Sequence, residues 1–256
     1  MSAWLVLTVA MAAACVVVLA IVMLNQRRVG ENDDPSKTPD VLEYMTMMIG
    51  VVYAIVLGLA IAGVWEARGA AEDAVRTEAQ ALHEVSARAA VYPEKAREKI
   101  RTDVDAYVTH VVDREWPHMA RHDELTARGT VLLDVVRRDV SSHVPRTELE
   151  SQTYQPVVDQ VAAADSARTA RAESAGATMP GVVWFGLVAG AVATVGMIFM
   201  LQIRRSGREL LMAGLFSALI AFLLFLIWNF DAPLGRDGHD SAAPFLALFP
   251  GAGGGG

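Results

Sequence analysis

The sequence has few of the residues on which catalysis, metal binding and nucleic-acid binding depend. Cys15 is the single cysteine among 256 residues, so an intramolecular disulfide and a cysteine metal cluster are both excluded. The net charge of −7 argues against nucleic-acid binding, which needs a basic face. No Ser-His-Asp order, nucleotide-binding loop or GxSxG motif is present. The sequence therefore gives no support for an enzyme and implies no cofactor.

Charge is also missing from four long stretches of the chain. A helix that crosses the hydrocarbon core of a bilayer, roughly 30 Å, needs about 20 apolar residues. Soluble core helices rarely run this far without a charge, so we expect all four stretches to cross a membrane. The first lacks the basic n-region of a signal peptide, and we expect it to be a retained anchor. The predicted spans are residues 4–24, 45–65, 181–203 and 210–230.

Charged residues gather between the second and third predicted spans. Residues 66–178 contain 20 acidic and 15 basic residues, while apolar residues such as Ile100, Val104 and Tyr107 recur there at helical spacing. This amphipathic pattern indicates folded helices. The sequence thus predicts an all-α, four-transmembrane-helix membrane protein with a helical extramembrane domain inserted between helices two and three.

The predicted organisation has four parts. The first and third parts hold two spans each, the second part is the helical domain, and the fourth is a flexible tail that ends in glycines. The boundaries are residues 1–65, 66–179, 180–230 and 231–256.

Prolines divide the inserted domain, because proline fits the first turn of a helix but not its interior. We expect Pro93, Pro117 and Pro145 to act as breaks, and Pro156 predicts either a kink in the last helix or its true start. No glycine or proline separates the second span from the first of these helices, so the two should be continuous. The predicted helices are residues 66–91, 94–116, 118–142 and 146–178.

Small residues recur every fourth position inside the spans, and such stripes let membrane helices approach closely. They indicate tight bundling or oligomerisation, although an Ala/Gly-rich composition can also produce them by chance. The positions predicted to pack are Gly50, Ala54, Gly58, Ala62, Gly186 and Gly190.

His118 and His122 stand four residues apart on a predicted helix, a spacing that can hold a metal ion. No HExxH motif or third ligand at fixed spacing accompanies them. A solvated helix face is the better interpretation, and no metal site is predicted.

Basic residues indicate the orientation of the spans. Both short connections are richer in Lys and Arg than the chain ends, so the positive-inside rule places them in the cytoplasm and the helical domain outside. The residues concerned are Arg27, Arg28 and Lys37 in the first connection and Arg204, Arg205 and Arg208 in the second, against Arg236 in the C-terminal tail.

Several local patterns resemble those of the bestrophin-like family of bacterial membrane proteins, common in actinobacteria. The resemblance covers nearly the whole chain, and its patterns occur in the same order. They are Tyr53–Gly58 followed by Val64-Trp65-Glu66, Tyr107 with Glu115-Trp116-Pro117, Arg168 and Arg171 followed by Met179-Pro180 and Trp184, and Asp231-Ala232-Pro233-Leu234-Gly235, in which Leu234 replaces the usual Phe.

The resemblance implies a homo-oligomer, with a pentamer favoured, that conducts ions such as chloride. Residues 55–59 resemble the pore-helix stretch of bestrophins. If this resemblance extends to the pore, Val51, Ile55 and Leu59 would line a hydrophobic neck on helix two, where aliphatic residues replace the family's aromatic ones. Bestrophins hold the inserted domain in the cytoplasm, opposite to the charge count, and we keep the orientation that the charge count predicts.

The sequence favours two functions over a small-molecule transporter, which would need a polar cavity at the membrane midplane that the sequence does not show. The first is a bestrophin-like ion channel, possible without intramembrane charge because a hydrophobic constriction gates by dewetting. The second is a non-conducting protein that the lipid bilayer anchors and whose helical domain binds an unknown protein partner. In both cases we expect a multi-pass protein of the bacterial cell membrane.

Overall fold

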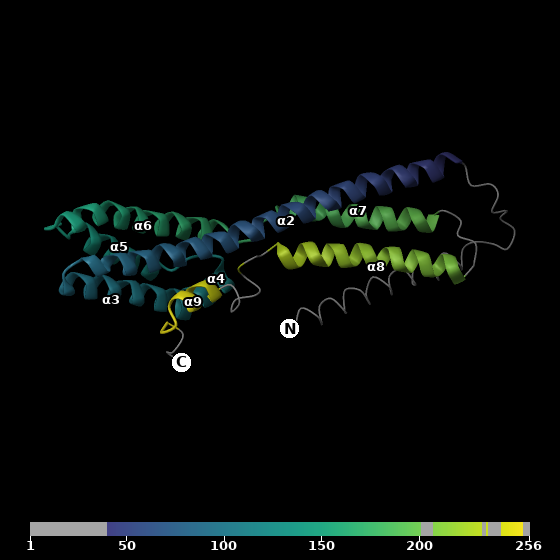
Figure 1. The fold of residues 1–256 in the computed structure, drawn as a ribbon. Helices are drawn as coiled ribbons and strands as arrows, with labels where there is room; N and C mark the ends of the chain where they lie inside the picture. The colour runs from purple at the N-terminus through teal and green to yellow at the C-terminus, as the bar shows by residue number, and fades with distance from the viewer. Residues whose placement is uncertain (1–39, 201–206, 232–233, 235–241, 253–256) are drawn as a thin grey trace. The chain divides into compact units, whose positions relative to one another are not determined.

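The computed structural model describes residues 40–200, 207–231, 234 and 242–252, and these residues form helices and turns without a strand (Figure 1). The prediction of an all-α fold is confirmed. The first predicted span, residues 4–24, and the basic residues of the first connection lie outside the described residues, as do Arg204 and Arg205 of the second.

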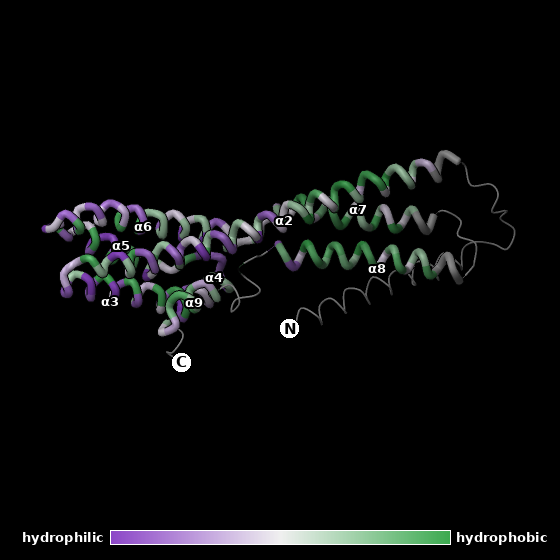
Figure 2. Tube along the Cα trace, in the orientation of Figure 1, coloured by the Kyte–Doolittle hydropathy of each residue, from purple (hydrophilic) through white to green (hydrophobic). Residues whose placement is uncertain are grey.

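The described residues form two compact units that differ in polarity (Figure 2). The apolar unit consists of residues 40–65, 179–200 and 207–231. The charged unit consists of residues 66–178, 234 and 242–252.

Helix α2 (Asp40–Arg88) is 49 residues long and contributes residues to both units. Its middle is rich in Ala and Glu, which favour helix, and no proline interrupts it. The helix ends at a short 3-10 turn, η2 (Ala89–Val91), just before Pro93. The prediction that the second span continues directly into the first helix of the inserted domain is therefore confirmed.

In the apolar unit, α2 packs with α7 (Gly181–Met200) and α8 (Gly207–Phe230). One face of α2 makes this contact, because its buried residues follow helical spacing. The buried residues are Tyr53, Leu57 and Val64 on α2, Leu187 and Ala191 on α7, and Ile220 and Ile227 on α8.

Two of the described helices are long and apolar enough to cross a bilayer. They are α2, within Tyr44–Val91, and α8, within Leu211–Phe230, while Gly181–Met197 of α7 is a shorter apolar stretch. Many large apolar side chains on these helices are exposed in the single chain, as expected for surfaces that meet lipid or another subunit.

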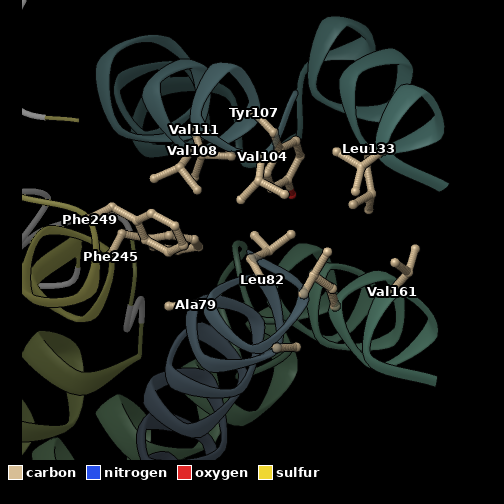
Figure 3. Packing of buried hydrophobic residues seen from close by; sticks show 14 of the residues in the cluster. Ala79, Leu82, Val104, Tyr107, Val108, Val111, Leu133, Val161, Phe245 and Phe249 are labelled. Atoms are coloured by element: carbon tan, nitrogen blue, oxygen red, sulfur yellow. The ribbon is translucent and has the colours of Figure 1, made fainter. Parts of the chain in front are cut away.

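In the charged unit, the second half of α2 packs with α3 (Glu94–His110), α5 (Ala127–Ser141) and α6 (Glu148–Glu173). Their apolar faces meet in one core, which Figure 3 shows from close by. Figure 3 labels core residues from each of these helices, including Leu82, Val104, Leu133 and Val161.

Two of the predicted proline breaks are confirmed. Pro93 directly precedes α3, and Pro145 lies in the loop between α5 and α6. Helix α6 begins at Glu148, where the Thr147 hydroxyl accepts a hydrogen bond from the Glu150 backbone N–H at 3.2 Å. Pro156 lies inside α6, so the alternative that this helix starts there is wrong.

The predicted break at Pro117 is wrong. Residues 94–122 form one helical run, in which a π turn, η3 (Val111–Glu115), joins α3 to α4 (Trp116–His122). A π turn bonds residue i to i+5 and locally frees the backbone, so a proline lacking an N–H fits just after it. The chain breaks instead after His122, where Asp123 has a left-handed conformation with φ of 57°.

Part of the predicted flexible tail is ordered on the charged unit. Residues 243–248 form the short helix α9 (Ala243–Leu248), and Phe245 is fully buried against the ring of Trp116. Phe249 lies against His83 of α2, and Figure 3 shows it beside Phe245. Two aromatic side chains one helical turn apart supply the apolar burial that holds this segment.

Candidate functional site

The three residues predicted to line a pore lie on one exposed face of α2. Val51, Ile55 and Leu59 are 56%, 59% and 69% exposed in the single chain. Steps of four residues keep them on the same side of the helix, away from the side of Tyr53 and Leu57, which packs on α7 and α8. The described part of the chain therefore leaves this apolar face uncovered.

The predicted small-residue stripe of α2 also packs against nothing in the described chain. Ala54, Gly58 and Ala62 are exposed, and a Cβ atom added at Gly50 or Gly58 would meet no atom within 4 Å. Gly186 on α7 has the same open surroundings. If these positions serve helix packing, their partner lies outside the described residues, either elsewhere in the chain or in another subunit.

Gly190 differs, because it lies directly beneath the ring of Tyr53. A Cβ atom there would come within 2.6 Å of the ring carbon Cδ2. The Tyr53 hydroxyl donates to the carbonyl oxygen of Leu187 at 3.0 Å, which satisfies the phenol inside this apolar bundle. Gly190 thus allows α2 and α7 to approach closely within one chain.

A network of charged side chains lies buried in the core of the charged unit. It contains two carboxylates, two guanidinium groups and one phenol, and every member is almost completely shielded from solvent. The members are Glu78 on α2, Tyr107 on α3, Glu115 at the end of the π turn, and Arg168 and Arg171 on α6.

Each arginine holds one carboxylate with two hydrogen bonds. Arg171 donates from Nε and Nη2 to Glu78 at 2.7 and 3.1 Å, and Arg168 donates from Nη1 and Nη2 to Glu115 at 2.6 and 2.8 Å. A further bond from Arg171 Nη2 to Glu115 Oε1, at 2.8 Å, joins the two pairs. Such bidentate geometry is what a buried ion pair needs to offset its desolvation.

Neighbouring polar groups complete the network. The Tyr107 hydroxyl donates to Glu78 Oε1 at 2.5 Å and accepts from Arg168 Nη1 at 2.9 Å. Thr126, the N-cap of α5, donates its hydroxyl and its backbone N–H to Glu115 Oε2 at 2.7 and 3.1 Å. The start of α5 is thereby attached to the same carboxylate that binds α6.

Aromatic rings and apolar side chains enclose the network. The Arg171 guanidinium lies 5.2 Å from the ring centre of Trp116, and that of Arg168 lies 5.6 Å from the ring centre of Tyr107. Both are cation–π distances. The enclosure keeps water out, so the charges interact more strongly than they would at the surface.

The pKa of Glu115 shows that its contacts with the two arginines outweigh its burial. Burial alone would raise it, but the hydrogen bond from Arg168 and the charges of Arg171 and Arg168 lower the pKa to about 2. A lowered folded-state pKa stabilises the fold above the ordinary value of 4.5, and this stabilisation is lost as pH falls toward about 2. Glu115 is therefore ionised and stabilising at neutral pH.

The network is neutral as a whole and its charges are paired, so we interpret it as a structural clamp. It joins α2, the α3–π-turn segment, the start of α5 and α6 in one cluster. Four members, Tyr107, Glu115, Arg168 and Arg171, belong to sequence patterns recognised separately. Sequence reasoning missed Glu78, although its core-facing spacing between Val75 and Leu82 is a signal that could have revealed it.

A second polar contact lies in the apolar unit, where α8 ends and α7 begins. The buried Asp231 carboxylate accepts from the Met179 backbone N–H at 2.7 Å and from Trp184 Nε1 at 2.8 Å. A carboxylate suits the positive N-terminal end of α7. The pattern that contains Met179 and Trp184 thus contacts the one that begins at Asp231. Leu234, in this last pattern, lies in the core of the charged unit.

The two histidines weighed as metal ligands stack on each other on α4. The ring centres of His118 and His122 are 4.4 Å apart, and His122 Nδ1 lies 3.1 Å from the carbonyl oxygen of His118. Among the described residues, no group of three or more His, Cys, Asp or Glu gathers that could hold a metal ion.

The fold and its buried contacts define a class: an all-helical protein with membrane-length apolar helices and a charged helical insert between them. The sequence matches the Bestrophin-like domain over residues 12–237, and the chain belongs to this family. The resemblance seen in the sequence patterns is therefore confirmed. No curated protein and no solved structure shows significant similarity to the chain.

Proposed function

We propose that the protein is a homo-oligomeric ion channel of the bacterial cell membrane, with four spans per subunit and α2 facing the central axis. A pentamer is the favoured assembly and anions such as chloride are the favoured ions. This proposal needs no enzymatic activity and no cofactor. The positive-inside count favours cytoplasmic short connections and an extracytoplasmic charged unit.

The observation that carries the proposal is the face of α2 that the described residues leave uncovered. The helix packs on its own chain through Tyr53, Leu57 and Val64, while Val51, Ile55 and Leu59 present an apolar row on the other side. A ring of subunits would turn this row into a hydrophobic constriction, which gates by dewetting. Membership of the Bestrophin-like family supports an oligomeric arrangement of this kind.

A polar substitution in this row tests the channel directly. We expect Leu59→Thr to raise anion efflux from proteoliposomes several-fold, because a hydroxyl lowers the cost of hydrating a hydrophobic constriction. Leu219→Thr on α8 makes the same chemical change at another exposed apolar position and should leave the rate unchanged.

Three outcomes separate the possible functions. Wild-type flux above that of empty liposomes, with an increase confined to Leu59→Thr, supports the channel and its axis. Flux that responds equally to both substitutions contradicts the assignment of α2 to the pore. Silence of all three proteins across anions and voltages contradicts conduction and favours the alternative of a membrane-anchored, partner-binding protein.

A further inference from the structure

Two aspartates face each other across the contact between α3 and α5 in the charged unit. Lys99, one helical turn before Asp103 on α3, reaches Asp139 Oδ1 at 2.6 Å, which brings this face of α3 against Asp139, and a side-chain hydrogen bond between the two aspartates shifts the pKa of both. Each has one buried oxygen, Oδ2, that no donor among the described residues reaches. The side chain of Asp139 is only 9% exposed, so water does not readily satisfy it.

Nearby cations offset only part of the negative charge of the two aspartates. Lys99, one turn before Asp103 on α3, donates from Nζ to Asp139 Oδ1 at 2.6 Å, but its side chain is 63% exposed. Arg138, on α5 next to Asp139, is the other cation that acts on the pair. Both cations leave the two Oδ2 atoms unbonded, and two neighbouring ionised carboxylates repel each other.

We propose that Asp103 and Asp139 share a proton, forming a carboxyl–carboxylate pair that fastens α3 to α5 in mildly acidic solution. One proton held between the two groups converts one of them into a hydrogen-bond donor and removes the repulsion. This latch is separate from the Glu78–Arg171 clamp and does not depend on the proposed channel activity.

The pKa shifts of the two groups agree with a shared proton. Burial, together with the hydrogen bond and charge of Asp139, raises the pKa of Asp103 to about 6, against the opposing charge of Lys99. The hydrogen bond with Asp103, followed by those from Lys99 and its charge, lowers the pKa of Asp139 against the effect of burial.

The sign of the pH dependence follows from the raised pKa of Asp103. Its stabilising contribution is fully present below the ordinary pKa of 3.8 and is lost as pH rises through about 6. The contribution of Asp139 has the opposite sign but changes only below pH 3.8, where its ordinary pKa lies. Between about pH 4 and pH 7 the latch therefore weakens as pH rises.

Asp103→Asn tests the latch, because an amide donates to Asp139 at every pH. In full-length protein in detergent, we expect the thermal midpoint of the charged unit to fall by about 2–4 °C more between about pH 5 and pH 7.5 in the wild type than in Asp103→Asn. Asp105→Asn, an exposed position on the same helix, should keep the wild-type difference.

Infrared spectroscopy supplies a second readout that does not depend on unfolding. The wild type should show a protonated-carboxyl band at about pH 5 that fades by about pH 7.5 and is absent from Asp103→Asn but present in Asp105→Asn. The proposal is overturned if Asp103→Asn keeps the full pH dependence of the midpoint, or if its carboxyl band matches that of the wild type.

Discussion

Replacing Arg171 with methionine is expected to lower the free energy of unfolding of the charged unit by about 3–5 kcal/mol. Methionine keeps much of the apolar stem but removes the guanidinium that binds both Glu78 and Glu115. Glu78 would then be a buried carboxylate that keeps, among the described residues, only the hydrogen bond from the Tyr107 hydroxyl. Guanidinium titration of the full-length protein in detergent, followed by circular dichroism, measures the loss.

Two further variants show whether the loss comes from an unpaired buried charge. Arg137→Met removes an arginine whose ion pairs with Asp134 and Asp165 are about half exposed, and it should cost less than about 1 kcal/mol. The double variant Glu78→Leu/Arg171→Met removes both charges and should recover most of the loss. A double variant no more stable than Arg171→Met alone would contradict the clamp.

Gly129→Ala is expected to destabilise the charged unit by about 1–3 kcal/mol or more, although the same change in a helix is ordinarily stabilising. Gly129 lies in the first turn of α5, directly against the ion-pair network. A Cβ atom there would collide with Glu115 Oε2 and come within 2.6 Å of Arg168 Nη2. Neither side chain can yield without breaking its hydrogen bonds.

Gly69 of α2 provides the matched control, because a Cβ atom at that position meets nothing within 4 Å. Gly69→Ala should stabilise the protein by up to about 1 kcal/mol, following helix propensity alone. The same denaturant titration compares the two variants. Stabilisation by both substitutions would show that the network has room that the structure does not indicate.

Local sequence signals predicted much of the fold because the physics behind them is local. Pro93 and Pro145 separate helices since proline lacks a backbone N–H and fixes φ. The continuity of α2 through Trp65 followed from the absence of a helix-breaking residue there. Pro117 misled the prediction, because the π turn before it also brings Glu115 into the buried network, and that contact is tertiary.

The buried clamp could be predicted only in pieces. Tyr107, Glu115, Arg168 and Arg171 stood out in the sequence as separate patterns, but nothing in their spacing indicated that they pair. Arg171 and Glu78 are 93 residues apart in the chain and meet only when α2 and α6 pack. Pairing of this kind depends on the tertiary fold and cannot be predicted from helical periodicity.

The C-terminal segment shows a second limit of prediction from the sequence. The run of glycines at the end of the chain led to the prediction of a flexible tail, which obscured the short apolar stretch before it. Phe245 and Phe249 lie one helical turn apart and bury their rings in the charged unit. A helix of six residues is too short to form alone, so its packing partners decide its structure.

Disulfide cross-linking between subunits tests the assignment of α2 to a shared axis most directly. In a Cys15→Ser background, a cysteine at position 59 should give cross-linked dimers of the membrane-embedded protein on mild oxidation, because α2 helices of different subunits face each other around the axis. A cysteine at position 219 on α8 should remain monomeric. The absence of a cross-link at position 59, or equal cross-linking at both positions, would contradict the account.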